Sequence, residues 1–151
     1  ASDLLKPGGE AGPLLGIFSR CDRGEQPADH HSIFFLPAQS QSNGKPGLNH
    51  VSFEMVNIDD VFMGHEILAK KGYELEWGIG RHYQGSQIFD YWRSPFGQIH
   101  EHQTDGDVFD NTFPPQIVDV MLDGDPSNPE MGPSQWGPAI NMETFGDERG
   151  L

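Results

Sequence analysis

Residues 49–103 change hydrophobic period twice, and these changes constrain the fold more than any other feature of the chain. HVSFEMV at 50–56 alternates strictly, which predicts a strand with two distinct faces. Apolar residues then recur at helical spacing over 58–69, Asn57 suits the N-cap, and Gly72 suits the end of a helix. A strand followed by a helix of about four turns is therefore expected.

Three more runs typical of strands follow the helix. They are YELEWGIG at 73–80, QIFDYW at 87–92 and QIHEHQ at 98–103, and turns containing glycine or proline separate them. The order over 49–103 is thus strand, helix and three strands, βαβββ, and the expected fold class is α+β.

The rest of the chain divides by composition. LLGIFSRC and HSIFFLPA are separated by a turn and predict two paired strands, which resemble the end of a second such module whose opening strand and helix are absent. The predicted parts are a mobile lead-in (1–13), the terminal strands of an incomplete first βαβββ module (14–38), a linker (39–48), the complete module (49–103) and an irregular extension (104–151).

Charge and composition exclude several partners. The 151 residues suit one folded unit, and 9 Lys+Arg against 23 Asp+Glu give a net charge of −14, which argues against nucleic acid and anionic membranes as partners. Cys21 is the single cysteine, so no intramolecular disulfide can form. With no secretory leader and no long apolar run, the cytoplasm is the expected location and no membrane span is expected.

Seven histidines are an enrichment in a chain of this size. On the last expected strand, alternation sends Glu101 to one face and His100 and His102 to the other. A carboxylate that faces the interior of a sheet needs a compensating partner, so an inward Glu101 would require a cation. In the other interpretation the two histidines face inward and Glu101 faces water, and alternation alone leaves both open.

Other polar side chains are candidates for proton transfer. His82 and Tyr91 lie nine positions apart, and an imidazole and a phenol near a metal can exchange protons with a bound anionic oxygen. The ordinary alternatives are a solvated histidine in a turn and a tyrosine in the core. His30 and His31 are adjacent, so if they and His50 all lie on strands of one sheet, only one of the two can face the same side as His50.

Six segments carry a family resemblance through their order and spacing. They are DHHSIFFL (29–36), LNHVSFEM (48–55), GRH (80–82), FDYWRSPFG (89–97), IHEH (99–102) and DGD (105–107). Together they resemble the vicinal oxygen chelate superfamily, and within it the type I extradiol ring-cleaving dioxygenases, the group of catechol 2,3-dioxygenase and 2,3-dihydroxybiphenyl dioxygenase. The resemblance covers roughly residues 14–110 and is to the C-terminal catalytic portion.

This resemblance implies an open barrel of βαβββ modules around a metal, usually Fe(II), with Mn(II) as the other candidate. The residues that it implies are the metal ligands His50 and Glu101, the second-sphere pair His82 and Tyr91, and one of His30 and His31 as the residue that steers dioxygen and moves protons. It selects the inward orientation of Glu101. The expected reaction is extradiol cleavage of a catechol-type diol with O2, as in aromatic hydrocarbon catabolism.

One ligand of the family is missing. Its other metal histidine lies on the first strand of the preceding module, and residues 1–13 contain no histidine. A fragment of a longer enzyme, a strand from a partner chain and a degenerate relative each explain this; we favour the fragment, because the sheet otherwise keeps an unpaired edge. Association as a homo-oligomer or with the missing upstream segment is expected. The alternatives are an aromatic-ligand-binding module without turnover and a metal-dependent glyoxalase-type isomerase or lyase.

Overall fold

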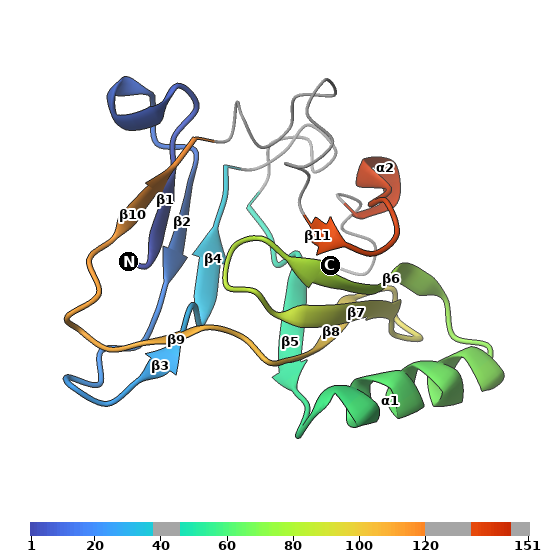
Figure 1. Cartoon of the computed structure of the whole chain (residues 1–151). Coiled ribbons are helices and arrows are strands. Elements are labelled where there is room, and N and C mark those ends of the chain that lie inside the picture. The colour runs from blue at the N-terminus through green and yellow to red at the C-terminus, as the bar shows by residue number, and fades with distance from the viewer. Residues whose placement is uncertain (38–45, 120–133, 146–151) are drawn as a thin grey trace. The chain divides into compact units, whose positions relative to one another are not determined.

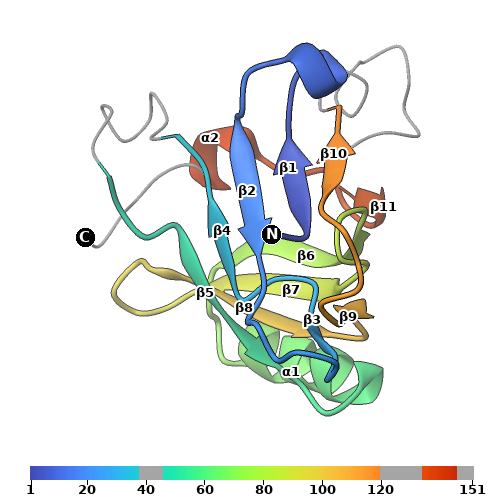
Figure 2. The same cartoon turned by 90° about the vertical axis from the view of Figure 1, so that its left-hand side faces the viewer.

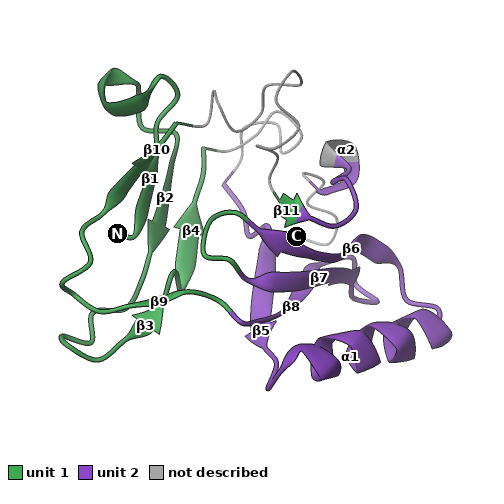
Figure 3. Cartoon of the chain, in the orientation of Figure 1, with its two compact units in different colours: residues 1–37, 83–86, 106–135 green, residues 38–82, 87–105, 136–151 purple. Residues whose placement is uncertain are grey.

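The computed structural model describes residues 1–37, 46–119 and 134–145, whose helices and strands are labelled in Figure 1. The chain forms two compact units: unit 1 comprises residues 1–37, 83–86 and 106–135, and unit 2 comprises residues 38–82, 87–105 and 136–151 (Figure 3). Part of the predicted linker (39–45) and parts of the predicted extension (120–133 and 146–151) lie outside the described residues.

Unit 2 has the βαβββ order that the changes of period predict. Its elements are β5 (His50–Glu54), α1 (Ile58–Lys70), β6 (Leu75–His82), β7 (Ile88–Arg93) and β8 (Ile99–Thr104). The strands form an open sheet of order β11-β6-β7-β8-β5, with β11 (Ser134–Trp136) at one edge and β5, parallel to β8, at the other. The predicted α+β class is confirmed.

The register of three neighbouring strands brings their middle residues together. Glu101 of β8 pairs with Tyr91 of β7 on one side and with Ser52 of β5 on the other. Residues that pair directly across strands share a face of the sheet, and His50 lies two residues before Ser52 on that same face. The sheet therefore gathers His50, Tyr91 and Glu101 on one surface.

Helices cover the two faces of this sheet (Figure 2). α1 packs against β7 and β8 on the face opposite Glu101. The short α2 (Met142–Phe145) lies on the other face, where Phe145 packs against the core. The buried members of that core are Trp77, Phe89, Tyr91 and Ile99.

Both predicted ends of α1 are confirmed. The side chain of Asn57 accepts a hydrogen bond from the backbone N–H of Asp60 at 3.1 Å, as an N-cap does. Gly72 follows the C-cap residue Lys71 with φ +76°, a conformation that glycine adopts without strain. Among the described residues, no helix is both long and apolar enough to cross a membrane.

A buried polar cluster joins α1 to the sheet. Asp90 of β7 is fully buried; it accepts hydrogen bonds from Trp92 Nε1 at 2.5 Å and pairs with His65 Nδ1 of α1 at 3.0 Å. Burial raises the pKa of the Asp90 carboxyl, and the hydrogen bonds of Trp92 and His65 and the charges of His65 and His102 only partly offset this.

Asp90→Asn is expected to remove a pH dependence of stability in the acid range. Because the pKa of Asp90 is raised by folding, its contribution to stability is fully present below the pKa of the unfolded chain and is lost as the pH rises through the folded pKa. Urea unfolding of both proteins over this range measures the difference. Identical pH profiles for the two proteins would contradict the prediction.

Unit 1 contains a four-stranded sheet of order β10-β1-β2-β4 and a two-stranded pair. The sheet strands are β1 (Asp3–Leu5), β2 (Gly16–Ser19), β4 (Ile33–Phe35) and β10 (Gln116–Val118); the pair is β3 (Ala28–Asp29) with β9 (Val108–Phe109), and a 3-10 helix spans Gly9–Ala11. β2 and β4 are antiparallel neighbours, so the two strands expected within residues 14–38 do pair.

Two segments are more regular than the sequence suggests. Residues 1–13 are wrongly predicted as a mobile lead-in, because β1 lies between β10 and β2 and buries Asp3 and Leu5. The predicted irregular extension supplies β9, β10, β11 and α2. Strands of two or three residues are too short to show a period, and neighbouring glycines and prolines conceal them.

Candidate functional site

Four predicted site residues converge on the inner face of unit 2. His50 Nε2 lies 3.5 Å from Glu101 Oε2, and His82 Nε2 lies 3.6 Å from Glu101 Oε1. His82 Nε2 also lies 2.9 Å from the hydroxyl of Tyr91. Glu101 is 5% exposed, so it has the inward orientation and not the solvent-facing one that alternation also allowed.

Glu101 is a buried carboxylate that stays charged. Burial alone would raise the pKa of its carboxyl, but hydrogen bonds and charge interactions with His50 and His82 outweigh burial and hold the pKa well below its ordinary value. Glu101 is therefore ionised at neutral pH, the state in which a carboxylate binds a metal cation.

Tyr91 is held in its protonated form. Burial, together with the charge and the hydrogen bond of Glu101, raises the pKa of the phenol well above its ordinary value. The hydroxyl, which lies 2.9 Å from His82 Nε2, can therefore donate its one proton to an anionic oxygen nearby.

Asn49 fixes the orientation of His50. Its Oδ1 lies 2.7 Å from His50 Nδ1, and an amide oxygen can only accept a hydrogen bond, so His50 carries its proton on Nδ1. Nε2 then faces the charged Glu101 oxygen 3.5 Å away. A proton or a cation can lie between these two atoms, and an imidazole nitrogen with a carboxylate oxygen is a donor set that fits a divalent metal.

Two candidate ligands for such a metal, His50 and Glu101, lie together among the described residues. In residues 1–37, 46–119 and 134–145, no group of three His, Cys, Asp or Glu side chains is arranged to hold a metal ion. A mononuclear site of two histidines and one carboxylate therefore needs a further ligand beside His50 and Glu101.

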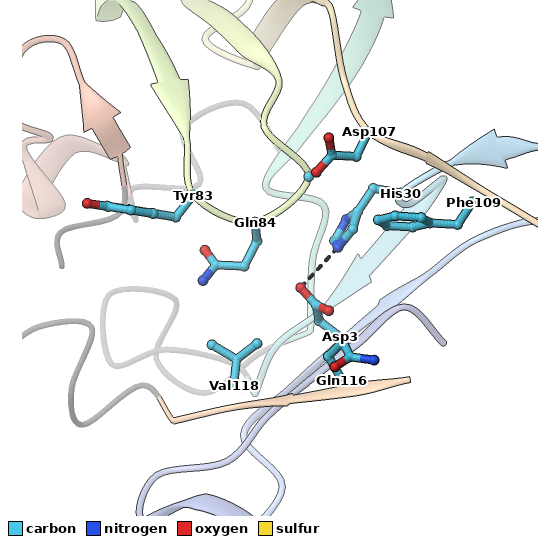
Figure 4. A pocket seen from close by; sticks show the side chains of 9 residues that line it. Asp3, His30, Tyr83, Gln84, Asp107, Phe109, Gln116 and Val118 are labelled. Carbon is cyan, nitrogen blue, oxygen red and sulfur yellow. Dashed lines mark hydrogen bonds and ion pairs between the residues drawn. The ribbon is translucent and has the colours of Figure 1, made fainter. Parts of the chain in front are cut away.

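His30 and His31 belong to unit 1, and Figure 4 shows His30 next to Asp3 among the residues that line a pocket of that unit. His30 is 2% exposed, its Nε2 lies 3.0 Å from Asp3 Oδ2, and its Nδ1 lies 3.0 Å from Nδ1 of His31. Both ring nitrogens of His30 are thus engaged, whereas His31 is less buried. Beside His30 is a cavity of about 310 Å³, whose lining includes Asp3, Tyr83, Gln84, Asp107 and Phe109.

Three residues near these candidates were not anticipated. Asn49 contacts a predicted ligand, Asp3 contacts a predicted catalytic histidine, and the ring centroid of Phe145 lies 5.2 Å from that of Tyr91. Asn49 directly precedes His50 in the sequence, and that adjacency is the one local signal that could have marked it. Asp3 and Phe145 are distant in sequence from the groups they contact.

Comparisons with known proteins place this geometry in context. The family model described as Glyoxalase/Bleomycin resistance protein/Dioxygenase superfamily matches residues 23–101, just over half of the chain, a range that includes His50 and Glu101. Metapyrocatechase 2 of Cupriavidus necator is 31% identical over 80 residues, which are 53% of this chain and 23% of that protein.

Solved structures show the same fold. The Mn(II)-bound glyoxalase from Novosphingobium aromaticivorans is 28% identical with a TM-score of 0.66, covering 95% of this chain and 40% of that one. Homoprotocatechuate 2,3-dioxygenase from Arthrobacter globiformis is 18% identical with a TM-score of 0.65, covering 99% of this chain and 41% of that one. The chain thus spans well under half the length of these relatives.

Proposed function

We propose that this chain, which belongs to the glyoxalase/bleomycin resistance protein/dioxygenase superfamily, forms part of an extradiol ring-cleaving dioxygenase. The reaction is cleavage of a catechol-type aromatic diol beside its two hydroxyl groups with O2. The observation that supports this proposal most strongly is Glu101, a buried and ionised carboxylate that faces Nε2 of His50 and lies beside the hydrogen-bonded pair of His82 and Tyr91.

His50 and Glu101 would hold a metal ion, which we propose to be Fe(II), with Mn(II) as the alternative for the same donor set. When bound, Fe(II) supplies a chelating site for both diol oxygens and a route for electrons from the diol to O2. The third protein ligand would come from sequence beyond these residues, either upstream or in a partner copy.

The neighbouring side chains handle protons and exclude water. His82 Nε2 is the proposed acceptor for a diol proton, and the Tyr91 hydroxyl, 2.9 Å away, donates a hydrogen bond to the resulting oxyanion. Trp77 and Phe89 pack around this pair, with the His82 ring 4.2 Å from the ring of Phe89. One of His30 and His31 is proposed to steer dioxygen and to transfer protons.

Tyr91→Phe is expected to lower turnover about 100-fold and to leave metal affinity nearly unchanged. The substitution removes the phenol hydroxyl but keeps the ring and both proposed ligands. Fe(II) titration and O2 uptake on the same preparations measure the two effects. A fall in metal affinity as large as the fall in turnover would contradict a role confined to proton handling.

A glyoxalase-type isomerase is the second candidate, because the Mn(II)-bound glyoxalase is among the similar structures. The two reactions differ in their need for oxygen. The protein is loaded anaerobically with Fe(II) or Mn(II) and supplied with catechol plus O2, or with the thiohemiacetal of glutathione and methylglyoxal.

Oxygen consumption in step with loss of catechol would support ring cleavage. Conversion of the thiohemiacetal without oxygen would support the isomerase. Catechol binding without oxygen consumption would support the third alternative, a binding module.

A further inference from the structure

Three hydrogen bonds hold the last described residues of the chain against the rest of unit 2. Trp77 Nε1 donates a hydrogen bond to the carbonyl of Pro138 at 2.8 Å, and Arg93 donates one to the carbonyl of Thr144 at 2.6 Å. Asn49 Nδ2 donates the third, to the carbonyl of Phe145 at 3.0 Å. We call residues 136–145 the C-terminal strap.

The strap brings an aromatic ring to the candidate metal site. The ring centroid of Phe145 lies 5.2 Å from that of Tyr91 and 6.1 Å from that of His50. It also contacts Trp77 nearly edge-on, at 5.7 Å and 83°. The strap therefore contacts a proposed ligand and a proposed proton donor.

Asn49 connects the strap to His50 through one planar amide. Its Nδ2 must donate to the carbonyl of Phe145, and this contact fixes which side of the amide carries the oxygen. Oδ1 then accepts from His50 Nδ1 at 2.7 Å. If Asn49 loses either partner, the amide is free to rotate and the proton of His50 is free to move to Nε2.

We propose that Asn49 is a positioning residue that couples the seating of the C-terminal strap to the tautomer and orientation of His50. A seated strap holds the Asn49 amide, the amide holds the proton on His50 Nδ1, and Nε2 remains the nitrogen that faces Glu101 and can bind a cation. The metal consequence of this coupling rests on the function proposed above, but the coupling itself needs no metal. Because coupling is reciprocal, a cation bound by His50 also favours the seated strap.

Two variants separate the two hydrogen bonds of the Asn49 side chain, one to His50 and one to Phe145. Asn49→Ala removes both contacts, whereas Asn49→Asp keeps an acceptor for His50 Nδ1–H and loses the donor to Phe145. Asn57→Ala is the matched control, since it removes another asparagine contact of unit 2, at the start of α1 and outside the site.

Three measurements on the full chain read out the coupling. NMR shifts of the ring nitrogens, at a pH where the ring is neutral, report the His50 tautomer. Amide exchange reports the seating of residues 136–145, and titration with Mn²⁺ alone reports affinity. We expect Asn49→Ala to give mixed tautomers, faster exchange in the strap and about 10–100-fold weaker Mn²⁺ binding.

We expect Asn49→Asp to keep the Nδ1–H tautomer while exchange in the strap becomes faster, and Asn57→Ala to leave both unchanged. An Asn49→Ala protein with the original tautomer and original strap exchange would overturn the inference, whatever its Mn²⁺ affinity. An unchanged chain that binds no Mn²⁺ at His50 would instead count against the proposed function, and the first two measurements would still decide the role of Asn49.

Discussion

Replacing Glu101 by glutamine is expected to abolish specific binding of a divalent metal and, with it, ring cleavage. Glutamine keeps the shape of the side chain but removes the charge that lies 3.5 Å from His50 Nε2. The affinity should fall by more than the roughly 10–100-fold that loss of an outer-sphere partner costs, because Glu101 is a proposed direct ligand.

Titration with Mn²⁺ measures this effect, and Glu54→Gln is the control. Glu54 is an exposed carboxylate of the neighbouring strand β5, and its loss reduces the negative net charge of the chain by the same amount. Equal weakening by the two substitutions would show that the acidic surface binds the cation, and this would contradict the assignment of Glu101.

Arg93→Leu is expected to destabilise unit 2 by about 3–5 kcal/mol, the usual result of leaving one member of a buried ion pair without its partner. Arg93 Nε contacts Glu76 Oε2 at 2.5 Å, and both side chains are at most 2% exposed. The other Glu76 oxygen has no hydrogen-bond partner among the described residues, so the carboxylate depends on Arg93. Arg93 also donates to the carbonyls of Gly97 and Thr144.

Urea unfolding followed by tryptophan fluorescence measures this cost. All three tryptophans, Trp77, Trp92 and Trp136, belong to unit 2, so the signal reports that unit. The double variant Glu76→Leu with Arg93→Leu should recover most of the loss, since an apolar pair leaves no unpaired charge. A cost below about 1 kcal/mol for the single variant, the usual range of a solvated pair, would contradict this account.

The fold of unit 2 could be predicted because its signals are local. Alternation over β5, helical spacing over α1, the Asn57 cap and the Gly72 end all lie within a few residues of the structures they specify. β1 could not be predicted in this way. Its three residues acquire their structure from pairing with β2, beyond the glycine-rich and proline-rich segment that follows β1, and with β10, which is more than a hundred residues away.

Only part of the candidate site could be predicted from the sequence. Alternation shows that Glu101 opposes His100 and His102, but it does not show which face is inward, and the family resemblance supplied that choice. The contact of Phe145 with Tyr91 joins residues more than fifty positions apart, and no local pattern encodes it. The sequence also left His30 and His31 equivalent, although Asp3 makes them different.

The measurement that tests the central claim most directly is line broadening by substoichiometric Mn²⁺ in the amide NMR spectrum of the isotope-labelled chain. If His50 and Glu101 form a metal site, the signals near these two residues and near Tyr91 should broaden first and should saturate together. Broadening that follows the acidic surface and leaves residues 50 and 101 sharp would contradict a metal centre in unit 2.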